Sequence, residues 1–325
     1  MISVIIPLYN KAHTIKRTLS SVVNQSYQNF EIIIINDGST DNSIQVINDN
    51  FDDNRVKIIN QQNKGVSVAR NTGVANSSYE HIAFLDGDDD WSKDYLKQIV
   101  DIIQKEPYYA MICTAGYIKN SKTGKQILRA DKALLNQIRP INFFKNPHVY
   151  CHTSASVVNK KIFLKTNGFP VEMKKNEDYA LFFSIALLGK TIYCGYPISY
   201  YYAEIDGQST KVNRKNQHES EKDVCERINQ TFRLWDSTGR KNILFQVFLK
   251  YELRHTFLFY LNKKEYDLIN LYMHSLDNKI LDLFSNLELL VYKQEFLNRL
   301  AKLIILVTKF RWRLRNFPRI AYSMN

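Results

Sequence analysis

The sequence predicts an α/β protein: a doubly wound, mainly parallel sheet flanked by helices, followed by a helical C-terminal region. Short runs rich in isoleucine and valine alternate with helix-like stretches in the N-terminal part of the chain. Ile32 to Ile35 lack polar alternation, as expected for a strand whose two faces are both covered by helices. From Gln217 onward, long helical stretches contain almost no glycine or proline. We therefore expect two units, residues 1–216 and residues 217–325.

Four N-terminal strands are predicted in chain order, at residues 3–7, 31–36, 55–60 and 81–85. We interpret the segments between them as crossover helices, which join parallel strands. In such a sheet, ligands bind beyond the carboxyl ends of the strands. Polar clusters follow these strands in the sequence, so this edge of the sheet is where a site is expected.

The following segment, from residue 109 to about residue 202, is interpreted as the second half of the same domain. It contains further strand signals and one helix signal. The strand signals lie at residues 155–158, 191–194 and 199–202, and the helix signal spans about residues 178–188.

The composition is that of a folded globular chain, because 45% hydrophobic and 23% charged residues exclude wholesale disorder. The four cysteines lack the paired spacing of a zinc site and the density of a disulfide framework, so we interpret them as reduced thiols. The first residues carry no basic leader, and no run of about 18 apolar residues occurs. We expect a cytoplasmic protein whose only membrane attachment is peripheral.

The formal net charge of +12 predicts a polyanionic partner: nucleic acid, an anionic membrane or a phosphorylated substrate. Seven basic residues and no acidic residue follow Glu295. Because the excess is concentrated on one tail rather than across a groove, a nucleic-acid interface is not expected.

Four carboxylates crowd into the five positions from Asp86 to Asp90, directly after the strand at residues 81–85. Such crowding is electrostatically costly without a cation. Magnesium-like ions take one or two protein carboxylates and leave their other positions to water and substrate phosphates, so a nucleoside diphosphate fits this loop. The alternative is a surface turn whose acidic side chains cap the helix that begins near Ser92.

Two other loops at the same predicted edge carry candidate contacts. Tyr9, after the first strand, can stack on a nucleobase, and Asp37, after the second, can accept a hydrogen bond from a base N–H group. Gly38 permits a close turn, and we interpret Asp41 as a helix cap only. Capping is also the alternative for Asp37, because Asn-Asp-Gly-Ser is common in turns.

A third loop leads into the helix that starts after Gly65. Arg70 lies one turn inside this helix, where its guanidinium could reach a phosphate or a carboxylate. The alternative makes Arg70 a cation on the helix surface and Gly73 a packing glycine.

Taken together, these motifs resemble the inverting glycosyltransferases of family 2, which have the GT-A fold. The resemblance covers residues 1 to about 100 and rests on four motifs in order. They are Ser3-Val4-Ile5-Ile6-Pro7-Leu8-Tyr9-Asn10, Asn36-Asp37-Gly38-Ser39-Thr40-Asp41, Ala69-Arg70-Asn71-Thr72-Gly73 and Leu85-Asp86-Gly87-Asp88-Asp89. The setting that the resemblance implies is bacterial surface polysaccharide synthesis.

The resemblance also implies roles for individual residues. Pro7, Tyr9 and Asp37 would frame the nucleotide, usually UDP. Asp86 and Asp88 would form the Asp-x-Asp site for the donor and for Mn²⁺ or Mg²⁺, with Asp88 as the direct metal ligand. The donor-binding residues expected are therefore Pro7, Tyr9, Asp37, Arg70, Asp86 and Asp88.

The segment Asn176-Glu177-Asp178-Tyr179 is similar to the family's Glu-Asp pair, in which the aspartate is the catalytic base, and the match falls on Asp178. An inverting transfer needs one base for the proton of the acceptor hydroxyl. The alternative is that Asp178 caps the following helix. In the loop at residues 206–211 many relatives have a histidine that this chain lacks, so no third protein ligand to the metal is assigned.

The basic tail, at about residues 296–319, predicts an amphipathic helix. Its apolar stripe consists of Phe296, Leu300, Leu303, Val307, Phe310 and Leu314. Basic residues flank the stripe: Arg299, Lys302, Lys309 and Arg313 on one edge, and Arg311 and Arg315 on the other. Such a stripe is typical of a helix in a membrane interface, where a lipid-linked acceptor would be within reach. The alternative is packing on the catalytic domain or on a second subunit.

The sequence therefore predicts a metal-dependent inverting glycosyltransferase that moves a sugar from a nucleoside diphosphate to a glycan or lipid-linked acceptor. A nucleotidyltransferase is one alternative, but no glycine-rich, lysine-containing phosphate loop lies near the first strand. A catalytically silent scaffold or membrane adaptor is another, and the retained Asp86, Asp88 and Asp178 argue against it.

Overall fold

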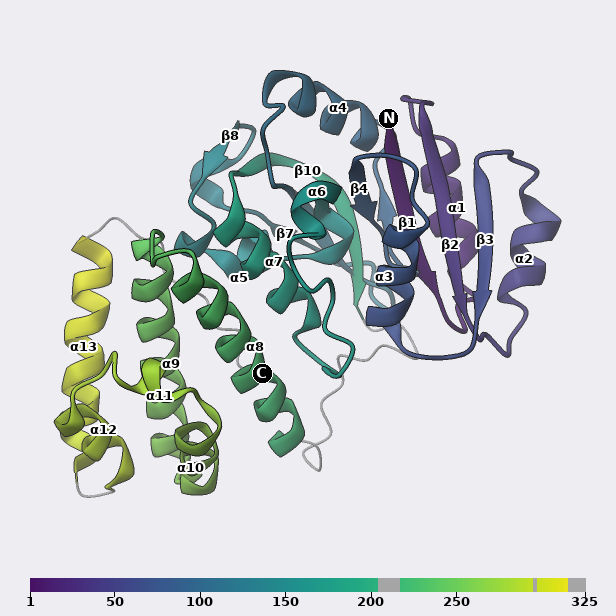
Figure 1. The fold of residues 1–325 in the computed structure, drawn as a ribbon. Helices are drawn as coiled ribbons and strands as arrows, with labels where there is room; N and C mark the ends of the chain where they lie inside the picture. Colours follow the sequence, from purple (N-terminus) through teal and green to yellow (C-terminus); the bar gives the residue numbers. More distant parts are fainter. Residues whose placement is uncertain (204–216, 295–296, 315–325) are drawn as a thin grey trace. The chain divides into compact units, whose positions relative to one another are not determined.

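The computed structural model describes residues 1–203, 217–294 and 297–314 (Figure 1). Parts of the sequence-based predictions lie outside these residues: the loop at 206–211, the end of the first predicted domain, and Phe296, Arg315 and Arg319 of the tail.

The chain divides into two compact units. The first contains Met1–Ile141, Val149–Glu172 and the described residues from Leu181 to Ala203. The second contains Asn142–His148, Met173–Ala180 and the described residues from Gln217 onward. Two short segments of the N-terminal region therefore group with the C-terminal helices.

The first unit is built on one sheet with the strand order β3-β2-β1-β4-β9-β6-β10-β5, and β7 and β8 pair with β6 and β10. The strands are β1 (Ile2–Leu8), β2 (Phe30–Asp37), β3 (Val56–Gln61), β4 (His81–Phe84), β5 (Asp90–Trp91), β6 (Met111–Asn120), β7 (Gln126–Arg129), β8 (Ile138–Ile141), β9 (Ser156–Asn159) and β10 (Thr191–Ala203). The first four strands of the chain match their predicted ranges to within one residue at each end.

The sheet is mixed. Strands β3, β2, β1 and β4 pair with one another in parallel, and β6 pairs in parallel with β10. Strand β9 runs antiparallel to both β4 and β6, between which it is inserted. The predicted α/β class with flanking helices is confirmed, and the parallel part is the part that carries the polar loops.

The two strands predicted at residues 191–194 and 199–202 are wrong as separate elements, because β10 runs through both. Its pairing with β6 shifts register between Cys194 and Pro197 and again between Pro197 and Ser199. Proline cannot donate a hydrogen bond to the ladder, so its position marks an irregularity in this strand rather than an end.

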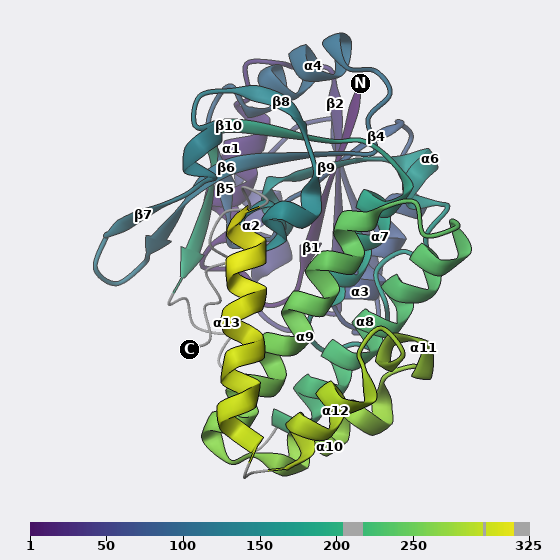
Figure 2. The same cartoon turned by 90° about the vertical axis from the view of Figure 1, so that its left-hand side faces the viewer.

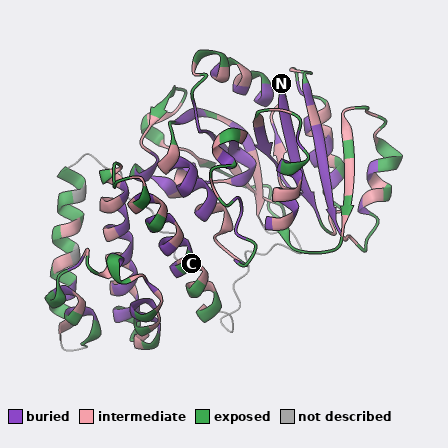
Figure 3. Cartoon of the chain, viewed as in Figure 1, coloured by how far each residue is buried: buried purple, intermediate pink, exposed green. Residues whose placement is uncertain are grey.

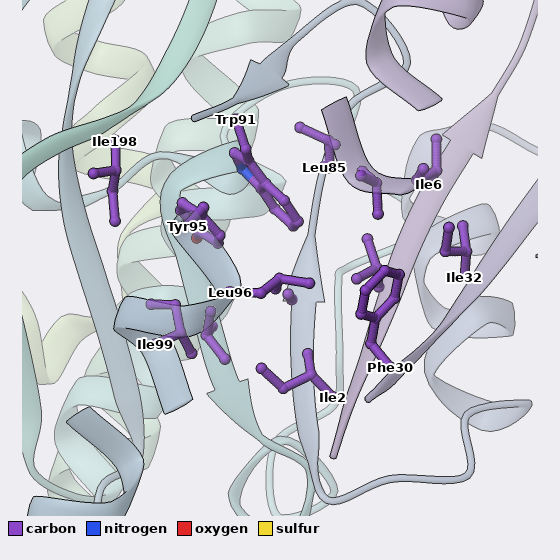
Figure 4. Close-up of a cluster of buried hydrophobic side chains, with 14 of the residues drawn as sticks. Ile2, Ile6, Phe30, Ile32, Leu85, Trp91, Tyr95, Leu96, Ile99 and Ile198 are labelled. Carbon is purple, nitrogen blue, oxygen red and sulfur yellow. The ribbon is translucent and has the colours of Figure 1, made fainter. Parts of the chain in front are cut away.

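Helices cover both faces of the parallel part. They are α1 (Ile15–Val23), α2 (Ser43–Asn50), α3 (Val66–Ala75), α4 (Tyr95–Lys105), α6 (Lys160–Phe163) and α7 (Glu177–Leu188), with the short turns η1 (Lys132–Leu134), η3 (Thr153–Ala155) and α5 (Pro147–Tyr150) nearby in the chain. Alternate residues of β1, including Ile2 and Ile6, pack into a core with α1 and α4 (Figure 4). The intervening Ile5 faces α3, where a Cβ atom on Gly73 would lie 2.3 Å from Ile5 Cγ2. The uninterrupted apolar pattern of these strands follows from this two-sided burial.

The second unit is helical. Its elements are η2 (Phe143–Lys145), α8 (Gln217–Ser237), α9 (Ile243–Lys263), α10 (Tyr266–Ser275), α11 (Asn278–Leu281), α12 (Asn286–Lys293) and α13 (Asn298–Leu314). Helix α13 lies alongside α9 (Figure 2) and also contacts α12. Within the unit, Arg227 of α8 and Glu252 of α9 form a buried ion pair of 2.6 Å. None of the described helices has the length and apolar character needed to cross a membrane.

Candidate functional site

The acidic loop, Asp86–Asp90, follows β4 at the carboxyl edge of the parallel strands. Leu85 N donates to Ile5 O, and Asp89 N donates to Asp86 O, so the loop leaves the sheet through a turn beside β1. Because β1, β2 and β4 are parallel neighbours, the loops that follow them leave from the same edge. Of the predicted donor contacts, Pro7, Tyr9, Asp37, Asp86 and Asp88 all belong to these three strands or their loops.

Each of the two carboxylates of the predicted metal site pairs with a cationic side chain. Arg70 Nη2 lies 2.7 Å from Asp86 Oδ1, and Lys11 Nζ lies 2.7 Å from Asp88 Oδ2. Arg70 is 4% exposed, so the alternative of a surface cation is wrong, and its guanidinium reaches a carboxylate as expected. The sequence had not pointed to Lys11.

The other two carboxylates of the loop are also engaged. Asp89 is fully buried; its Oδ2 accepts from Ser154 Oγ, and its Oδ1 accepts from Tyr202 N at 3.1 Å. Asp90 accepts from Tyr202 Oη at 2.8 Å and lies 3.4 Å from Arg17 Nε. The guanidinium of Arg17 stacks on the Tyr202 ring at 3.7 Å.

Burial dominates the electrostatics of these two groups. It raises the pKa of Asp89 well above its ordinary value, and the neighbouring carboxylates of Asp86 and Asp88 raise it further. Burial also raises the pKa of Asp90, against the opposing effect of the hydrogen bond from Tyr202. The loop thus contains two carboxyl groups, Asp89 and Asp90, whose burial favours the neutral form. Asp86 and Asp88 are paired with Arg70 and Lys11.

Helix α1 and the residues before it hold the backbone of the acidic loop. Thr14 Oγ1 donates to Gly87 O at 2.8 Å, and Thr18 Oγ1 donates to Asp89 O at 2.7 Å. Arg17 Nη2 donates to Asp88 O. Side chains three and four positions apart lie on one face of a helix, so these bonds come from one side of α1. The carbonyl groups of Gly87, Asp88 and Asp89 therefore all accept hydrogen bonds from side chains of this one segment.

Asp37 is buried and uses both of its carboxylate oxygens within the protein. Oδ1 accepts from Gln61 Nε2 and from Lys64 N, and Oδ2 accepts from Gly65 N at 2.9 Å. These bonds tie the end of β2 to the chain that enters α3. The structure therefore gives Asp37 a loop-holding role, and its contact with a base remains a prediction.

The loops after β1 and β2 are tied to each other. Asn10 Oδ1 accepts from Thr40 N at 2.8 Å, and Asn10 N donates to Ser39 Oγ at 3.1 Å. Asp41 accepts from Ser43 N at the first residue of α2, but the cap position is Asn42, and Asp41 Oδ2 also accepts from Ala12 N at 3.0 Å. The expectation that Asp41 acts as a cap only is therefore wrong. Gly38 has a φ of +74°, which explains the glycine at this turn.

Tyr9 is a large aromatic side chain that is exposed at this edge, with an exposed fraction of 45%. It directly follows β1, in which Pro7 pairs with Ile35. A solvent-exposed aromatic ring beside a fixed loop has the surface that a nucleobase needs for stacking.

Asp178 belongs to the second unit, in the segment Met173–Ala180. Helix α7 begins at Glu177, so Asp178 lies within its first turn rather than at its cap. Its Oδ1 accepts from Tyr179 N at 2.7 Å. A carboxylate in the first turn is stabilised in its ionised form by the helix dipole, and the ionised form is the one that can accept a proton.

The residues present fit a divalent metal in their donor chemistry. Asp86 and Asp88 offer carboxylate oxygens, and their ion pairs with Arg70 and Lys11 show that this loop already attracts cationic groups. No group of three or more potential metal ligands occurs in the part of the chain that the structure describes. Two carboxylates, with the remaining positions left to phosphate and water, is the coordination that Mg²⁺ commonly has.

Sequence reasoning missed several residues that shape this loop. They are Lys11, Thr14, Arg17, Thr18, Ser154 and Tyr202. Only Lys11 carried a usable signal, because it directly follows the Tyr9-Asn10 pair of the first motif.

Comparisons with known proteins agree with the fold and the position of the motifs. The model of the family described as "Glycosyl transferase family 2" matches residues 3–166. An Escherichia coli protein, described as UDP-Glc:alpha-D-GlcNAc-diphosphoundecaprenol beta-1,3-glucosyltransferase WfgD, is 31% identical over 203 residues, which are 62% of this chain and 76% of that protein. An uncharacterized glycosyltransferase of Rickettsia conorii is 33% identical over 186 residues, 57% of this chain and 30% of that protein.

Two solved structures share the fold at low sequence identity. S. aureus TarS in complex with UDP-GlcNAc has a TM-score of 0.64 and 15% identity, covering 96% of this chain and 91% of that one. A mannosyltransferase from Pyrobaculum calidifontis in complex with GDP-Man and Mn²⁺ has a TM-score of 0.51 and 16% identity, covering 71% of this chain and 64% of that one. At this identity, the likeness shows a common fold.

Proposed function

Because the chain belongs to glycosyl transferase family 2, we propose that it moves a hexosyl or N-acetylhexosaminyl group from a nucleoside diphosphate to a hydroxyl group of a glycan or lipid-linked acceptor. The observation that carries this proposal is the acidic loop Asp86–Asp90, fixed by α1 at the carboxyl edge of the parallel strands. This loop lies within the residues that the family model matches. The setting that we propose is bacterial surface polysaccharide synthesis.

The donor that we propose is a UDP-sugar. Tyr9 would stack on the base, while Pro7 and Asp37 frame it and Arg70 and the acidic loop lie on the diphosphate side. Two similar proteins are described with uridine nucleotides, namely the E. coli glucosyltransferase and S. aureus TarS. The P. calidifontis structure contains GDP-Man, so the base requires a direct test.

Asp88 and Asp86 are the residues that would hold Mn²⁺ or Mg²⁺. When bound, the metal would neutralise negative charge on the diphosphate leaving group. Lys11 and Arg70 are paired with these carboxylates in the structure, and both cations are long enough to contact phosphate oxygens instead.

Asp178 is the base that we propose for an inverting transfer. Its carboxylate would accept the proton of the acceptor hydroxyl as that oxygen bonds to the anomeric carbon. The bond between this carbon and the diphosphate oxygen breaks, and its electron pair leaves with the diphosphate. Attack on the face opposite the leaving group inverts the configuration.

A cytoplasmic position on the inner face of the cell membrane is the location that we propose. The E. coli relative is described as acting on an acceptor carried by diphosphoundecaprenol, which is a lipid. A lipid-linked acceptor requires that the enzyme reach a membrane surface.

The donor site is tested by calorimetric titration of UDP, GDP and dTDP into the purified protein, with and without Mn²⁺. Metal-dependent binding of one nucleotide, lost in Asp88→Ala and retained in the exposed-surface variant Asp94→Ala, supports the proposal. Absence of nucleotide binding under every condition would overturn it and leave a silent scaffold with this fold.

The base is tested separately by Asp178→Asn, with Glu177→Gln in the same helical turn as the matched control. Loss of a general base lowers kcat on the order of 10²- to 10⁴-fold, without weakening nucleotide binding. Equal losses in both variants, or a full rate in Asp178→Asn, would assign the base to another group.

A further inference from the structure

Helix α13 presents two different sides. Its inner side is attached to the rest of the second unit: Ala301 is buried, and Thr308 Oγ1 accepts from Arg254 Nη1 at 3.2 Å. Arg254 is itself held by Glu288 of α12 through two bonds of 2.6 and 2.9 Å. The helix is therefore fixed on α9 and α12 and not a loose extension of the chain.

A second side of α13 is apolar and open to solvent (Figure 3). Large apolar residues repeat along it at spacings of three and four. They are Leu300 (39% exposed), Leu303 (54%), Val307 (44%), Phe310 (63%) and Leu314 (67%), with Leu306 (65%) beside them. Single exposed apolar residues are ordinary, but a continuous row of them marks an interaction surface.

This side of α13 is not the inner side, which packs on α9 and α12. At 100° per residue, the apolar row lies next to the face that carries Ala301 and Thr308 rather than on it. Among the side chains that the structure describes, Ala301 is buried and Thr308 is half-buried, while the large apolar residues of the row are exposed.

The charge of α13 indicates the chemistry of the partner that its apolar row would contact. Helix α13 contains no acidic residue, and its exposed basic residues are Arg299, Lys302, Lys309, Arg311 and Arg313. All of these except Arg311 lie on the edge of the apolar row away from the inner side. A second copy of the chain would bring an identical cationic helix against this one, and like charges at close range repel. An anionic surface with an apolar interior complements both features.

We propose that the apolar row of α13 inserts into the interface of an anionic lipid bilayer, with the flanking basic residues among the headgroups. A helix of 17 residues is about 25 Å long, too short and too charged to span a membrane but long enough to lie along its surface. The apolar side chains enter the boundary of the acyl chains, while the long stems of lysine and arginine reach outward to the phosphates. None of these residues belongs to the proposed nucleotide site, so the inference does not depend on which sugar is transferred.

The experiment is vesicle flotation of the full chain with phosphatidylcholine alone and with added phosphatidylglycerol. We expect binding to the anionic vesicles only, and weaker binding as salt is raised. Val307→Ser with Phe310→Ser should lower the affinity at least about tenfold, because each replaced side chain is one that burial in the bilayer stabilises. Lys302→Gln with Arg313→Gln should also lower it about tenfold.

Matched controls distinguish a specific role of α13 in vesicle binding from the general effect of removing exposed apolar or basic side chains. Leu287→Ser with Leu290→Ser removes two leucines of α12 that are 65% and 48% exposed, and Lys16→Gln with Lys97→Gln removes two exposed lysines of the first unit. Both controls should bind vesicles like the parent. Circular dichroism melting and nucleotide titration of each variant show that the fold and the donor site remain.

Three results would overturn the proposal. Equal binding to neutral and anionic vesicles would remove the role of charge, and equal losses in the α12 control would remove the role of α13. A concentration-dependent dimer, seen by light scattering and abolished by Val307→Ser with Phe310→Ser, would make a second copy the occupant. Failure of nucleotide binding alone would count against the proposed function and not against this surface.

Discussion

Lys11 Nζ lies 2.7 Å from Asp88 Oδ2, so the carboxylate that the family motif assigns to the metal is paired with an ammonium group of the same chain. Both side chains are largely buried, at 17% and 11% exposed. The pair joins the loop after β1 to the loop after β4, across 77 residues of sequence. A divalent metal that bound Asp88 through this oxygen would have to displace the lysine.

Replacing Lys11 should therefore strengthen metal binding in the absence of nucleotide. An ion pair of this kind is worth on the order of 1 kcal/mol, so Lys11→Ala should raise the affinity for Mn²⁺ about threefold to tenfold. Electron paramagnetic resonance of free Mn²⁺ measures this directly. Lys11→Arg should keep the parent affinity, as should Lys16→Ala at an exposed position. A lower affinity in Lys11→Ala would show that Lys11 supports the metal site instead of competing for it.

Gly73 is required by the packing of α3 on β1. A Cβ atom there would lie 2.3 Å from Ile5 Cγ2, so Gly73→Ala should destabilise the protein by about 1–3 kcal/mol. Alanine gains about 1 kcal/mol in helix propensity, and the clash outweighs this gain. Urea unfolding measures the difference. Ile5→Ala removes the clashing methyl group, so the double variant should lose less than the sum of the two single variants.

Replacing only one residue of the buried pair Arg227 and Glu252 should strongly lower the free energy of unfolding. Their side chains are 4% and 9% exposed, and either Arg227→Met or Glu252→Leu should lower stability by about 3–5 kcal/mol, because a buried charge loses its partner. Replacing both, as Arg227→Met with Glu252→Leu, should cost much less. Urea unfolding of the three variants forms the cycle, and additive losses would show that the two residues act through other contacts.

His255 should make the protein sensitive to acid. Burial, with a further contribution from Lys309, lowers the pKa of His255 to about 4, and its ordinary value is near 6.5. Since the unfolded chain takes up the proton first, the stability tied to the neutral ring is complete above pH 6.5 and is lost as the pH falls toward 4.

The free energy of unfolding should accordingly fall more between pH 7 and pH 5 for the parent than for His255→Gln. Urea unfolding at the two pH values gives the comparison, and His274→Gln, at an exposed histidine of α10, serves as the control. Identical pH dependence in the parent and His255→Gln would assign the acid sensitivity to other groups.

The part of the fold that the sequence predicted well is the part fixed by local pattern. Strands β1, β2, β3 and β4 are apolar runs between polar turns, and their ranges were recoverable for that reason. The insertion of the antiparallel β9 between β4 and β6 depends on pairing between distant segments. Strand pairing is not encoded in the periodicity of a single segment, so it could not be predicted in the same way.

In the site, too, local sequence features could be predicted and contacts between distant segments could not. The acidic loop was identified because four carboxylates stand together in the sequence, and their mutual repulsion predicts that a cation lies beside them. The structure supplies cationic partners from the chain itself, through Lys11, Arg17 and Arg70. These contacts join residues between 16 and 77 positions apart, so they appear only once the strands have been brought side by side.

The bonds from Thr14, Arg17 and Thr18 hold the carbonyl groups of the acidic loop through contacts within the chain. The conformation of the loop should therefore not depend on a bound ligand. The free-energy cost of bringing the carboxylates of this loop together is met as the chain folds. Binding of the proposed nucleotide would therefore not have to supply it. A protein prepared in chelator should therefore keep its thermal transition, unlike domains that collapse when their metal is stripped. It also means that α1 fixes the shape of the loop at which we propose that the nucleotide binds.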